Sequence, residues 1–205
     1  MLPDTHPKVM VLSDAQAADV AVTPLNVASW SFRSKTLVQS SPDLLLIRPS
    51  VGYRLFSFMF VFLGTVAILV GLAAVFGQIK NIQGASPTTF GLCFAGIGLL
   101  FASIGLGLIC WTKTFGFDRR RGILTDGKKT WRLADILAVQ LLFGGRHSSS
   151  DNGSYLTYQL NLVFKDAEKS RVNISNADDQ DWTRKTGAQL AEFLKVPLLD
   201  HIETK

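Results

Sequence analysis

The chain has 205 residues, of which 47% are hydrophobic, and its formal net charge is +5. This length suits one or two small domains. From residue 112 onward, 15 Lys and Arg residues stand against 12 Asp and Glu residues, which is a net charge of +3. So balanced a composition excludes the electrostatic footprint of a domain that binds nucleic acid.

The first 50 residues fall into two parts. Residues 1–28 are rich in Ala, Asp, Pro and Val without a sustained period, which predicts a flexible tail. In residues 29–50, the stretch SWSFRSKTLV alternates, with Trp30 and Phe32 on one side, and a Ser-Ser-Pro-Asp turn and the apolar LLLIRP follow. This pattern predicts two short strands, the second of which ends at Pro49.

Two long uncharged runs come next. Residues 55–77 and 90–111 carry no charge, and each exceeds the roughly 20 residues that cross a hydrocarbon core of about 30 Å. Neither has the polar face of a helix in a soluble protein. The first starts more than 50 residues into the chain and is too long for the core of a signal peptide. We therefore predict two transmembrane helices. Because neither contains an ionisable residue, a proton, ion or transport pathway is disfavoured.

The cations that flank these runs predict their orientation. Arg48 and Arg54 precede the first run. Lys113 and Arg119–Arg121 follow the second, whereas the connector QIKNIQGASPTT holds only Lys80. Since loops rich in Lys and Arg stay in the cytoplasm, we expect an integral membrane protein with both termini on the cytoplasmic side.

Small residues recur at helical spacing within both runs. Such residues let two helix backbones approach closely in lipid, so we expect the two helices to pack on each other. A homo-oligomer formed through the same faces is the alternative. The residues concerned are Ala67, Gly71 and Ala74 in the first run and Gly98, Ala102 and Gly105 in the second.

After residue 111 the hydrophobic period changes from 3.6 to 2, which indicates strands. The turn RRRG, the turn at Asp126-Gly127 and the polar loop GGRHSSSDNGS separate the alternating stretches. The predicted strands are KTFGFD, ILT, KTWRL, ILAVQLLF, YLTYQLNLVF and RVNIS. In the longest of them, one side carries Leu156, Tyr158, Leu160, Leu162 and Phe164.

The last stretch, DDQDWTRKTGAQLAEFLKV, predicts an amphipathic helix that starts at an Asn176 or Asp178 cap and stops at Pro197. Its apolar side carries Trp182, Leu190, Phe193 and Leu194. The expected fold is therefore a membrane α+β fold. It combines a transmembrane helical hairpin with a small, mostly antiparallel β-domain over residues 112–200, capped by a C-terminal helix.

A helical hairpin followed by FDRRRGILT, WRLADILAVQLL, YQLNLVF and LAEFLKVPLLD resembles bacterial two-transmembrane-helix membrane proteins with a pleckstrin-homology-like (PH-like) domain. The resemblance implies a PH-like β-domain and a place in the bacterial inner (plasma) membrane. It also implies that the strands of residues 29–50 join this domain, with the hairpin inserted near its start. It provides no ligand-binding positions.

One stretch comes close to a phosphate-binding loop. GILTDGKKT (Gly122–Thr130) follows the G-x-x-x-x-G-K-[ST] pattern up to Lys129, which stands where Ser or Thr is required. Such a loop must also lead into a helix, whereas TWRL is typical of a strand. A hairpin turn at Asp126-Gly127 accounts for the same residues.

The remaining chemistry-bearing residues form no recognisable site. His6, His147 and His201 lack the spacing of a metal pair. Cys93 and Cys110 are about five helical turns apart in one run, which excludes a disulfide between them and a zinc site. We expect no cofactor, no metal site and no enzymatic activity.

The basic residues of FDRRRGIL follow the second apolar run closely. A strand that leaves the membrane directly, at about 3.3 Å per residue, places them roughly 20 Å from its surface. This exceeds a Debye length of about 8 Å. A solvated hairpin tip is therefore favoured. The alternative is a headgroup site for anionic lipid, made by Arg119, Arg120, Arg121, Lys128 and Lys129.

These features favour a non-enzymatic, membrane-anchored interaction or scaffold protein. Its expected partners are the lipid bilayer and an unidentified membrane protein. The alternative function is an anionic-lipid headgroup sensor that uses the basic hairpin turns.

Overall fold

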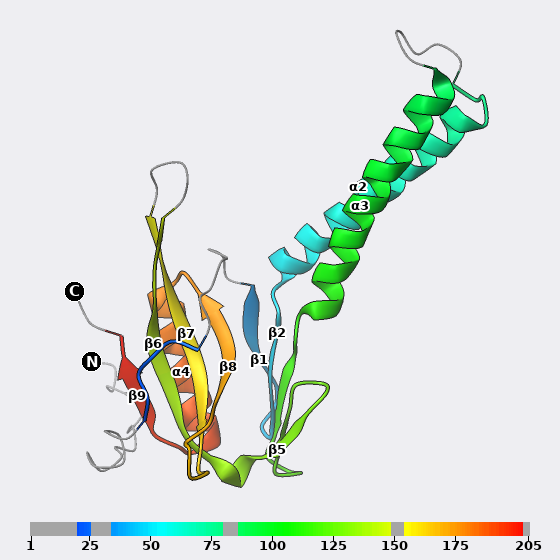
Figure 1. The fold of residues 1–205 in the computed structure, drawn as a ribbon. Helices are drawn as coiled ribbons and strands as arrows, with labels where there is room; N and C mark the ends of the chain where they lie inside the picture. Colours follow the sequence, from blue (N-terminus) through cyan, green and yellow to red (C-terminus); the bar gives the residue numbers. More distant parts are fainter. Residues whose placement is uncertain (1–19, 26–33, 80–85, 149–153, 203–205) are drawn as a thin grey trace, which may run out of the picture. The chain divides into compact units, whose positions relative to one another are not determined.

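The computed structural model describes residues 20–25, 34–79, 86–148 and 154–202. The chain divides into two compact units, and Figure 1 labels most of their helices and strands. The β-domain consists of Met1–Arg48 and Lys113–Lys205, and the helical hairpin consists of Pro49–Thr112. The hairpin is therefore an insertion in the sequence of the β-domain.

The helical hairpin consists of α2 (Val51–Val75) and α3 (Pro87–Trp111), which have 25 residues each. Both helices are long and apolar enough to span a membrane. Each starts before the predicted apolar run because a serine caps it. The side chain of Ser50 accepts the backbone N–H of Tyr53 at 3.1 Å, and that of Ser86 accepts the N–H of Thr89 at 3.3 Å.

Glycines bring the backbones of α2 and α3 into contact. A Cβ atom on Gly98 would lie 2.6 Å from the carbonyl oxygen of Gly64 and 2.7 Å from the backbone nitrogen of Ile68. A Cβ atom on Gly71 would lie 2.6 Å from the carbonyl oxygen of Gly91. No side chain fits at these distances without moving the helices apart. The predicted packing of the two helices on each other is confirmed.

The small residues identified in the sequence therefore lie where α2 and α3 pack against each other. Gly71, Gly98 and Gly105 are buried, while Ala67 and Ala102 are half-buried. A homo-oligomer stays a prediction, and it needs a different face of these helices.

The outer surface of the hairpin is apolar. Phe62 and Leu69 of α2 are 67% and 60% exposed, and Leu92 of α3 is 63% exposed. Cys93 and Cys110 are also exposed. In water, exposed apolar area costs about 25 cal/mol per Å² relative to burial, whereas hydrocarbon would cover this surface without that cost.

The first sheet of the β-domain has five strands in the order β1-β2-β3-β4-β5. The β2–β3, β3–β4 and β4–β5 ladders are antiparallel, and Ile47 lies opposite Phe115. Two strands lie within residues 29–50, as predicted, but the first extends through Ser40 and Ser41, which were expected in the turn, and Trp30 and Phe32 lie outside the described residues. The strands are β1 (Lys35–Ser41), β2 (Leu44–Pro49), β3 (Phe115–Asp118), β4 (Ile123–Thr125) and β5 (Thr130–Arg132).

The second sheet has four strands in the order β8-β7-β6-β9. A single 3₁₀ turn (Leu133–Asp135) connects it to the first sheet. Its strands are β6 (Ile136–Ser148), β7 (Ser154–Phe164), β8 (Arg171–Ala177) and β9 (Leu198–His201).

Two expectations for this sheet were wrong. The stretch GGRHS, expected in a polar loop, belongs to β6, because a bulge between Phe143 and Gly145 lets Gly145 take a φ of 128° within the strand. β9 was not predicted at all. It pairs with β6 in parallel, with Val139 opposite Leu198, so its hydrogen-bond partners are far away in the sequence.

The helix α4 (Gln180–Leu194) confirms the predicted C-terminal helix, but both of its ends differ from the prediction. Asp179, rather than Asn176 or Asp178, is the N-cap, and its carboxylate accepts the N–H of Trp182 at 2.9 Å. The helix stops before Pro197, because Lys195 takes the left-handed conformation with a φ of 56°.

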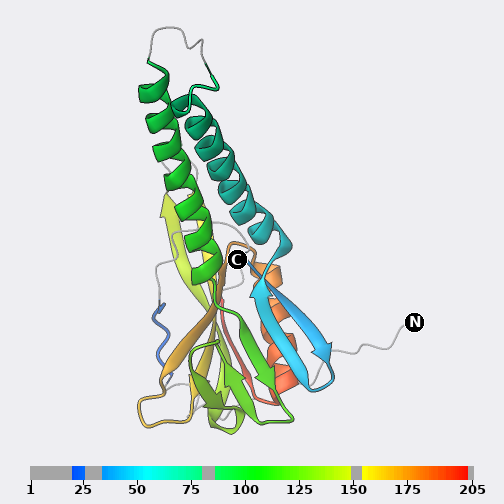
Figure 2. The ribbon, with the colours of Figure 1, turned by 90° about the vertical axis from the view of Figure 1, so that its right-hand side faces the viewer.

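One hydrophobic core joins both sheets and α4. In Figure 2, β1 and β2 (blue and cyan) stand in front of α4 (orange). The alternation predicted for β7 is confirmed, since Tyr158, Leu160, Leu162 and Phe164 belong to this core and the partly buried Leu156 packs against it. The first sheet contributes Leu45, Ile47, Phe115, Phe117 and Leu124, and α4 contributes Leu190, Ala191 and Phe193.

Residues 20–25 lie on the second sheet, so the expected tail without fixed contacts was wrong for this segment. Val20 is 3% exposed and packs on Ala138, Val163 and Leu199. The carbonyl oxygen of Ala21 accepts a hydrogen bond from the buried Gln140 at 3.0 Å. A buried polar side chain needs a hydrogen-bond partner, and Gln140 obtains its partner from residues 20–25. The rest of residues 1–28 lies outside the described residues.

Replacing Gly98 with Ile should push the two helices apart, because the new side chain meets the backbone of α2. Overpacking of this kind costs about 1–3 kcal/mol. The SDS concentration at the midpoint of unfolding in mixed micelles should therefore fall. Gly96→Ile in the same helix is the matched control, since a Cβ atom there meets nothing within 4 Å. Equal midpoints for both variants would contradict the backbone contact.

Candidate functional site

The three arginines of RRRG lie in the turn between β3 and β4, as predicted. The N–H of Gly122 donates to the carbonyl oxygen of Arg119 at 3.2 Å, and Gly122 takes a φ of 69°, a conformation that favours glycine. The carboxylate of Asp118 accepts the backbone N–H of Arg121 at 2.9 Å. The backbone N–H of Arg119 donates to the carbonyl oxygen of Asp43 at 2.9 Å, and this bond connects the turn to the β1–β2 turn.

The side chain of Arg119 packs against the end of α4. Its guanidinium lies 4.1 Å from the centre of the Phe193 ring. It donates hydrogen bonds to the carbonyl oxygen of Phe193 and, at 3.4 Å, to that of Glu192. Carbonyl groups in the last turn of a helix have no partner within the helix and carry partial negative charge. Arg119 therefore caps α4, which is a structural role.

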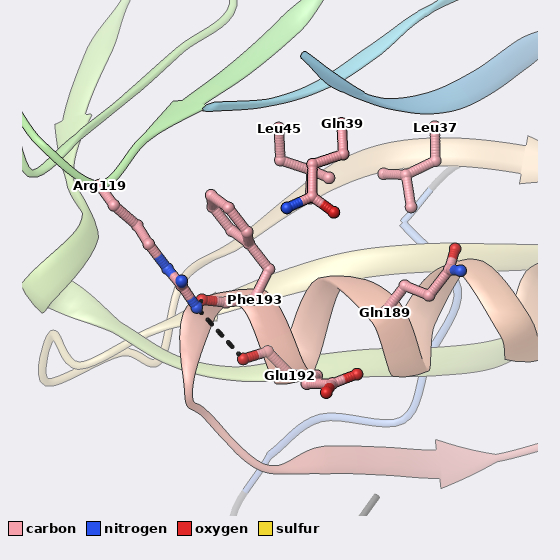
Figure 3. Close-up of a pocket in the computed structure, with 7 residues that line it drawn as sticks. All are labelled: Leu37, Gln39, Leu45, Arg119, Gln189, Glu192 and Phe193. Atoms are coloured by element: carbon pink, nitrogen blue, oxygen red, sulfur yellow. Dashed lines mark hydrogen bonds between the residues drawn. The ribbon is translucent and has the colours of Figure 1, made fainter. Parts of the chain in front are cut away.

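A cavity of about 380 Å³ lies beside Arg119, between β1 and β2 on one side and α4 on the other (Figure 3). Its charged lining residues are Arg119 and Glu192, and the guanidinium of Arg119 already contacts the helix carbonyls. The cavity therefore does not favour an anion such as a lipid phosphate. The other lining residues are Leu37, Gln39, Leu45, Gln189 and Phe193.

Arg120 and Arg121 form the solvated tip of the turn, and both are exposed. Arg121 Nε lies 3.8 Å from a carboxylate oxygen of Asp118, and the Arg121 side chain is 78% exposed. An ion pair this exposed contributes little to stability. Of the three arginines, these two are the ones available for a ligand.

Lys128 and Lys129 lie in a different place from the arginines. They belong to the turn between β4 and β5, whereas the arginines belong to the turn between β3 and β4. The two turns are at opposite ends of β4, so the five predicted cations do not form one cluster. Both lysines are exposed.

Lys128 and Lys129 instead share one end of the first sheet with Arg48 and Lys113. Ile47 lies opposite Phe115 at the end of the β2–β3 ladder, and Arg48 and Lys113 follow just beyond it. Lys113 Nζ lies 2.9 Å from a carboxylate oxygen of Asp126, in the turn that carries the two lysines. All four cations are exposed. We call Arg48, Lys113, Lys128 and Lys129 the basic end of the sheet.

Asp126 organises this turn. It is 6% exposed, and one carboxylate oxygen accepts the N–H groups of Lys128 at 3.0 Å and Lys129 at 2.7 Å. Burial raises the pKa of Asp126, but these hydrogen bonds and Lys113 outweigh that effect and lower it from 3.8 to about 2. The carboxylate is therefore ionised at neutral pH and fixes the backbone of Lys128 and Lys129, two residues that are exposed.

Lys35 lies under the basic end and connects the two sheets. Its ammonium donates to the carbonyl oxygen of Ile174 in β8 and lies 4.8 Å from the centre of the Phe115 ring. Burial, with a smaller contribution from the charge of Lys113, lowers the pKa of Lys35 from 10.5 to about 8. Lys35 is thus a structural cation that loses its proton at a lower pH than an ordinary lysine does.

Sequence reasoning missed two of these features for different reasons. Asp126 was interpreted only as a turn residue, although an Asp followed by Gly-Lys-Lys is typical of a carboxylate that accepts the next backbone N–H groups. The partners of Arg119 are 73 and 74 residues away in the sequence. No local pattern signals that contact.

The other candidate motifs give no site in the part of the chain that the structure describes. The near-match to a phosphate-binding loop is the β4–β5 hairpin, and Thr130 starts a strand rather than a helix. No group of three or more His, Cys, Asp or Glu in the described residues can hold a metal. His6 and the side chain of His147 lie outside the described residues.

Replacing Arg119 with Ala should destabilise the β-domain by about 1–2 kcal/mol, because the Phe193 contact and the capping hydrogen bonds are lost. Thermal unfolding followed by near-UV circular dichroism in detergent measures this. Arg120→Ala, one residue away, should change the free energy of unfolding by less than about 0.5 kcal/mol. If both variants melt alike, Arg119 does not cap α4.

The free energy of unfolding should rise between pH 8 and pH 10.5. Over this range the unfolded chain keeps Lys35 protonated while the folded chain releases the proton. The gain is up to about 3 kcal/mol. Lys35→Met should lose most of this rise, whereas Lys185→Met, which replaces an exposed lysine of α4, should keep it. Denaturant titrations at several pH values test this, and an unchanged slope in Lys35→Met would refute it.

The chain has no significant match in any comparison with known proteins. No protein-family model, no curated protein and no solved structure matches it. The resemblance to bacterial membrane proteins with a PH-like domain therefore stays a prediction, and the function must be inferred from the residues themselves.

Proposed function

We propose that the chain is a non-enzymatic, two-pass integral membrane protein that presents a PH-like β-domain as an interaction or scaffold module. In this proposal α2 and α3 span the bacterial inner membrane, and both termini and the β-domain are cytoplasmic. The partner that the module recruits is a second membrane protein.

The insertion of the hairpin between β2 and β3 carries this proposal. β2 ends at Pro49 and α2 starts at Val51, while α3 ends at Trp111 and β3 starts at Phe115. Two short links therefore attach the β-domain to the apolar helices. Attachment at two points restricts the motion of a domain more than a single anchor does, which suits a scaffold.

The basic end favours anionic-lipid binding as a second candidate function. Arg48 precedes Val51 by three residues and Lys113 follows Trp111 by two. At no more than about 3.6 Å per residue, both lie within roughly 11 Å of an apolar helix. Clusters of four or more Lys and Arg beside a membrane span are typical of contact with anionic headgroups, at about 1 kcal/mol per cation. Lys128 and Lys129 lie at the same end of the sheet as Arg48 and Lys113, whereas Arg120 and Arg121 lie in the turn at the other end of β4.

Native mass spectrometry of the full chain, taken from carbonate-washed membranes into a mild detergent, tests both functions. Two double variants that each remove two exposed cations form a matched pair: Lys128→Gln with Lys129→Gln, and Arg120→Gln with Arg121→Gln. We expect a stoichiometric protein companion in the wild type and in both variants. Retention of anionic lipid should fall roughly 30-fold in the lysine variant alone.

Other outcomes change the conclusion. Loss of lipid in the lysine variant without any protein companion would replace the scaffold with a lipid sensor. Loss in the arginine variant would move the lipid site to the β3–β4 turn. Release of the chain by carbonate would refute the two membrane spans, and a chain that retains neither protein nor lipid would refute both functions.

A further inference from the structure

The β-domain contains a second cavity, of about 400 Å³, which is separate from the one beside Arg119. Its lining comes from three places: the β6–β7 hairpin, the first residue of α4 and the end of β9. This volume is within the range of pockets that bind small molecules.

The walls of this cavity are largely apolar. Phe143 of β6, Leu156 and Tyr158 of β7 and Ile202 all line it. Phe143 lies opposite Tyr158, with the ring centres 6.1 Å apart in an edge-on arrangement. Phe143 is nevertheless 42% exposed, whereas Tyr158 and Ile202 are 6% and 5% exposed. An apolar ligand in the cavity would cover the exposed part of the Phe143 ring.

The polar groups that line the cavity are hydrogen-bond donors. Arg146 of β6 contributes an exposed guanidinium. Gln180 accepts the hydroxyl of Tyr158 at 3.3 Å through its oxygen, which leaves its Nε2 group as a donor. His201 of β9 is the third polar side chain. Among the described lining residues there is no carboxylate, so the cavity favours an acceptor that carries negative charge.

His201 presents a buried polar atom at this cavity. Its Nε2 atom is buried and has no hydrogen-bond partner in the described structure. A buried polar atom without a partner costs free energy comparable to a lost hydrogen bond. The pairing of β9 with β6, in which His201 lies opposite Leu142, holds the backbone of His201 in place. In the form of His201 that is protonated at Nε2, this nitrogen would donate to a ligand acceptor in the cavity.

We propose that this cavity binds a fatty acid, with the carboxylate held by Arg146, Gln180 and His201 and the alkyl chain lying against Phe143, Leu156 and Ile202. The donors match the two oxygens of a carboxylate, and the apolar walls match an alkyl chain. A polyphosphate would need more than one cation. A neutral alcohol would leave the guanidinium without a counter-charge.

Isothermal titration of the full chain in nanodiscs, with the signal of empty nanodiscs subtracted, tests the site. The probes are octanoate, octanol and acetate, which separate the contribution of the charge from that of the chain. Octanoate should bind at least tenfold more tightly than octanol, because octanol lacks the charge that strengthens the hydrogen bonds. It should also bind at least tenfold more tightly than acetate, because acetate lacks the alkyl chain that the apolar walls bury.

Four variants locate the binding. Arg146→Gln and His201→Phe should each weaken octanoate binding about tenfold and leave octanol binding unchanged. Leu156→Trp should abolish binding of both because it fills the cavity. Arg132→Gln is the matched control, since Arg132 is exposed on β5 and does not line the cavity. Circular dichroism confirms that each variant is folded.

The proposal has clear contrary outcomes. Equal affinities for octanoate and octanol would show a merely apolar cavity, and equal affinities for octanoate and acetate would show an anion site without a chain pocket. Either result, or no binding of octanoate, would overturn the fatty-acid assignment. Because Arg146 is exposed, its variant should fold even where His201→Phe does not. Unchanged octanoate affinity in Arg146→Gln would also refute the site.

Discussion

The pairing of β2 with β3 is the constraint on which the rest of the structure depends. It joins Ile47 to Phe115 across the whole helical hairpin, and closing so long a loop costs conformational entropy. Ile47, Phe115 and Phe117 are almost completely buried in the shared core, and this burial offsets that cost. Because the ladder ends where the hairpin begins, the chain leaves and re-enters the β-domain at one end of the first sheet.

That arrangement assigns different roles to cations that are close in sequence. Arg119, at the far end of the β2–β3 ladder, caps α4, and its neighbours face solvent. Lys128 and Lys129 lie at the end of the sheet where the chain enters the hairpin, and the buried Asp126 accepts their backbone N–H groups. The short strand β4 separates a structural arginine from two surface lysines, so a single basic site spanning both turns does not form.

The cavity beside Arg119 and the cavity beside Arg146 differ in whether their polar groups already have partners. Beside Arg119, the guanidinium already binds the carbonyl groups of α4, so the described residues that line that cavity offer no unused cation. In the other cavity, Arg146 is exposed and His201 Nε2 has no partner in the described structure. A ligand gains most where polar groups are desolvated but unsatisfied, because it supplies a hydrogen bond that the fold leaves out.

The sequence alone determined the features that depend on neighbouring residues. These are the two apolar helices, the alternation from Leu156 to Phe164, the turns at RRRG and Asp126-Gly127, and the C-terminal helix, since hydrophobic period and turn chemistry are local properties. Only the tertiary structure decided the parallel strand β9, the contact of residues 20–25 with the second sheet, the capping of α4 by Arg119 and the burial of His201 Nε2, which has no hydrogen-bond partner in the described structure. Each of these depends on partners distant in the chain, and no local pattern encodes which distant segments meet.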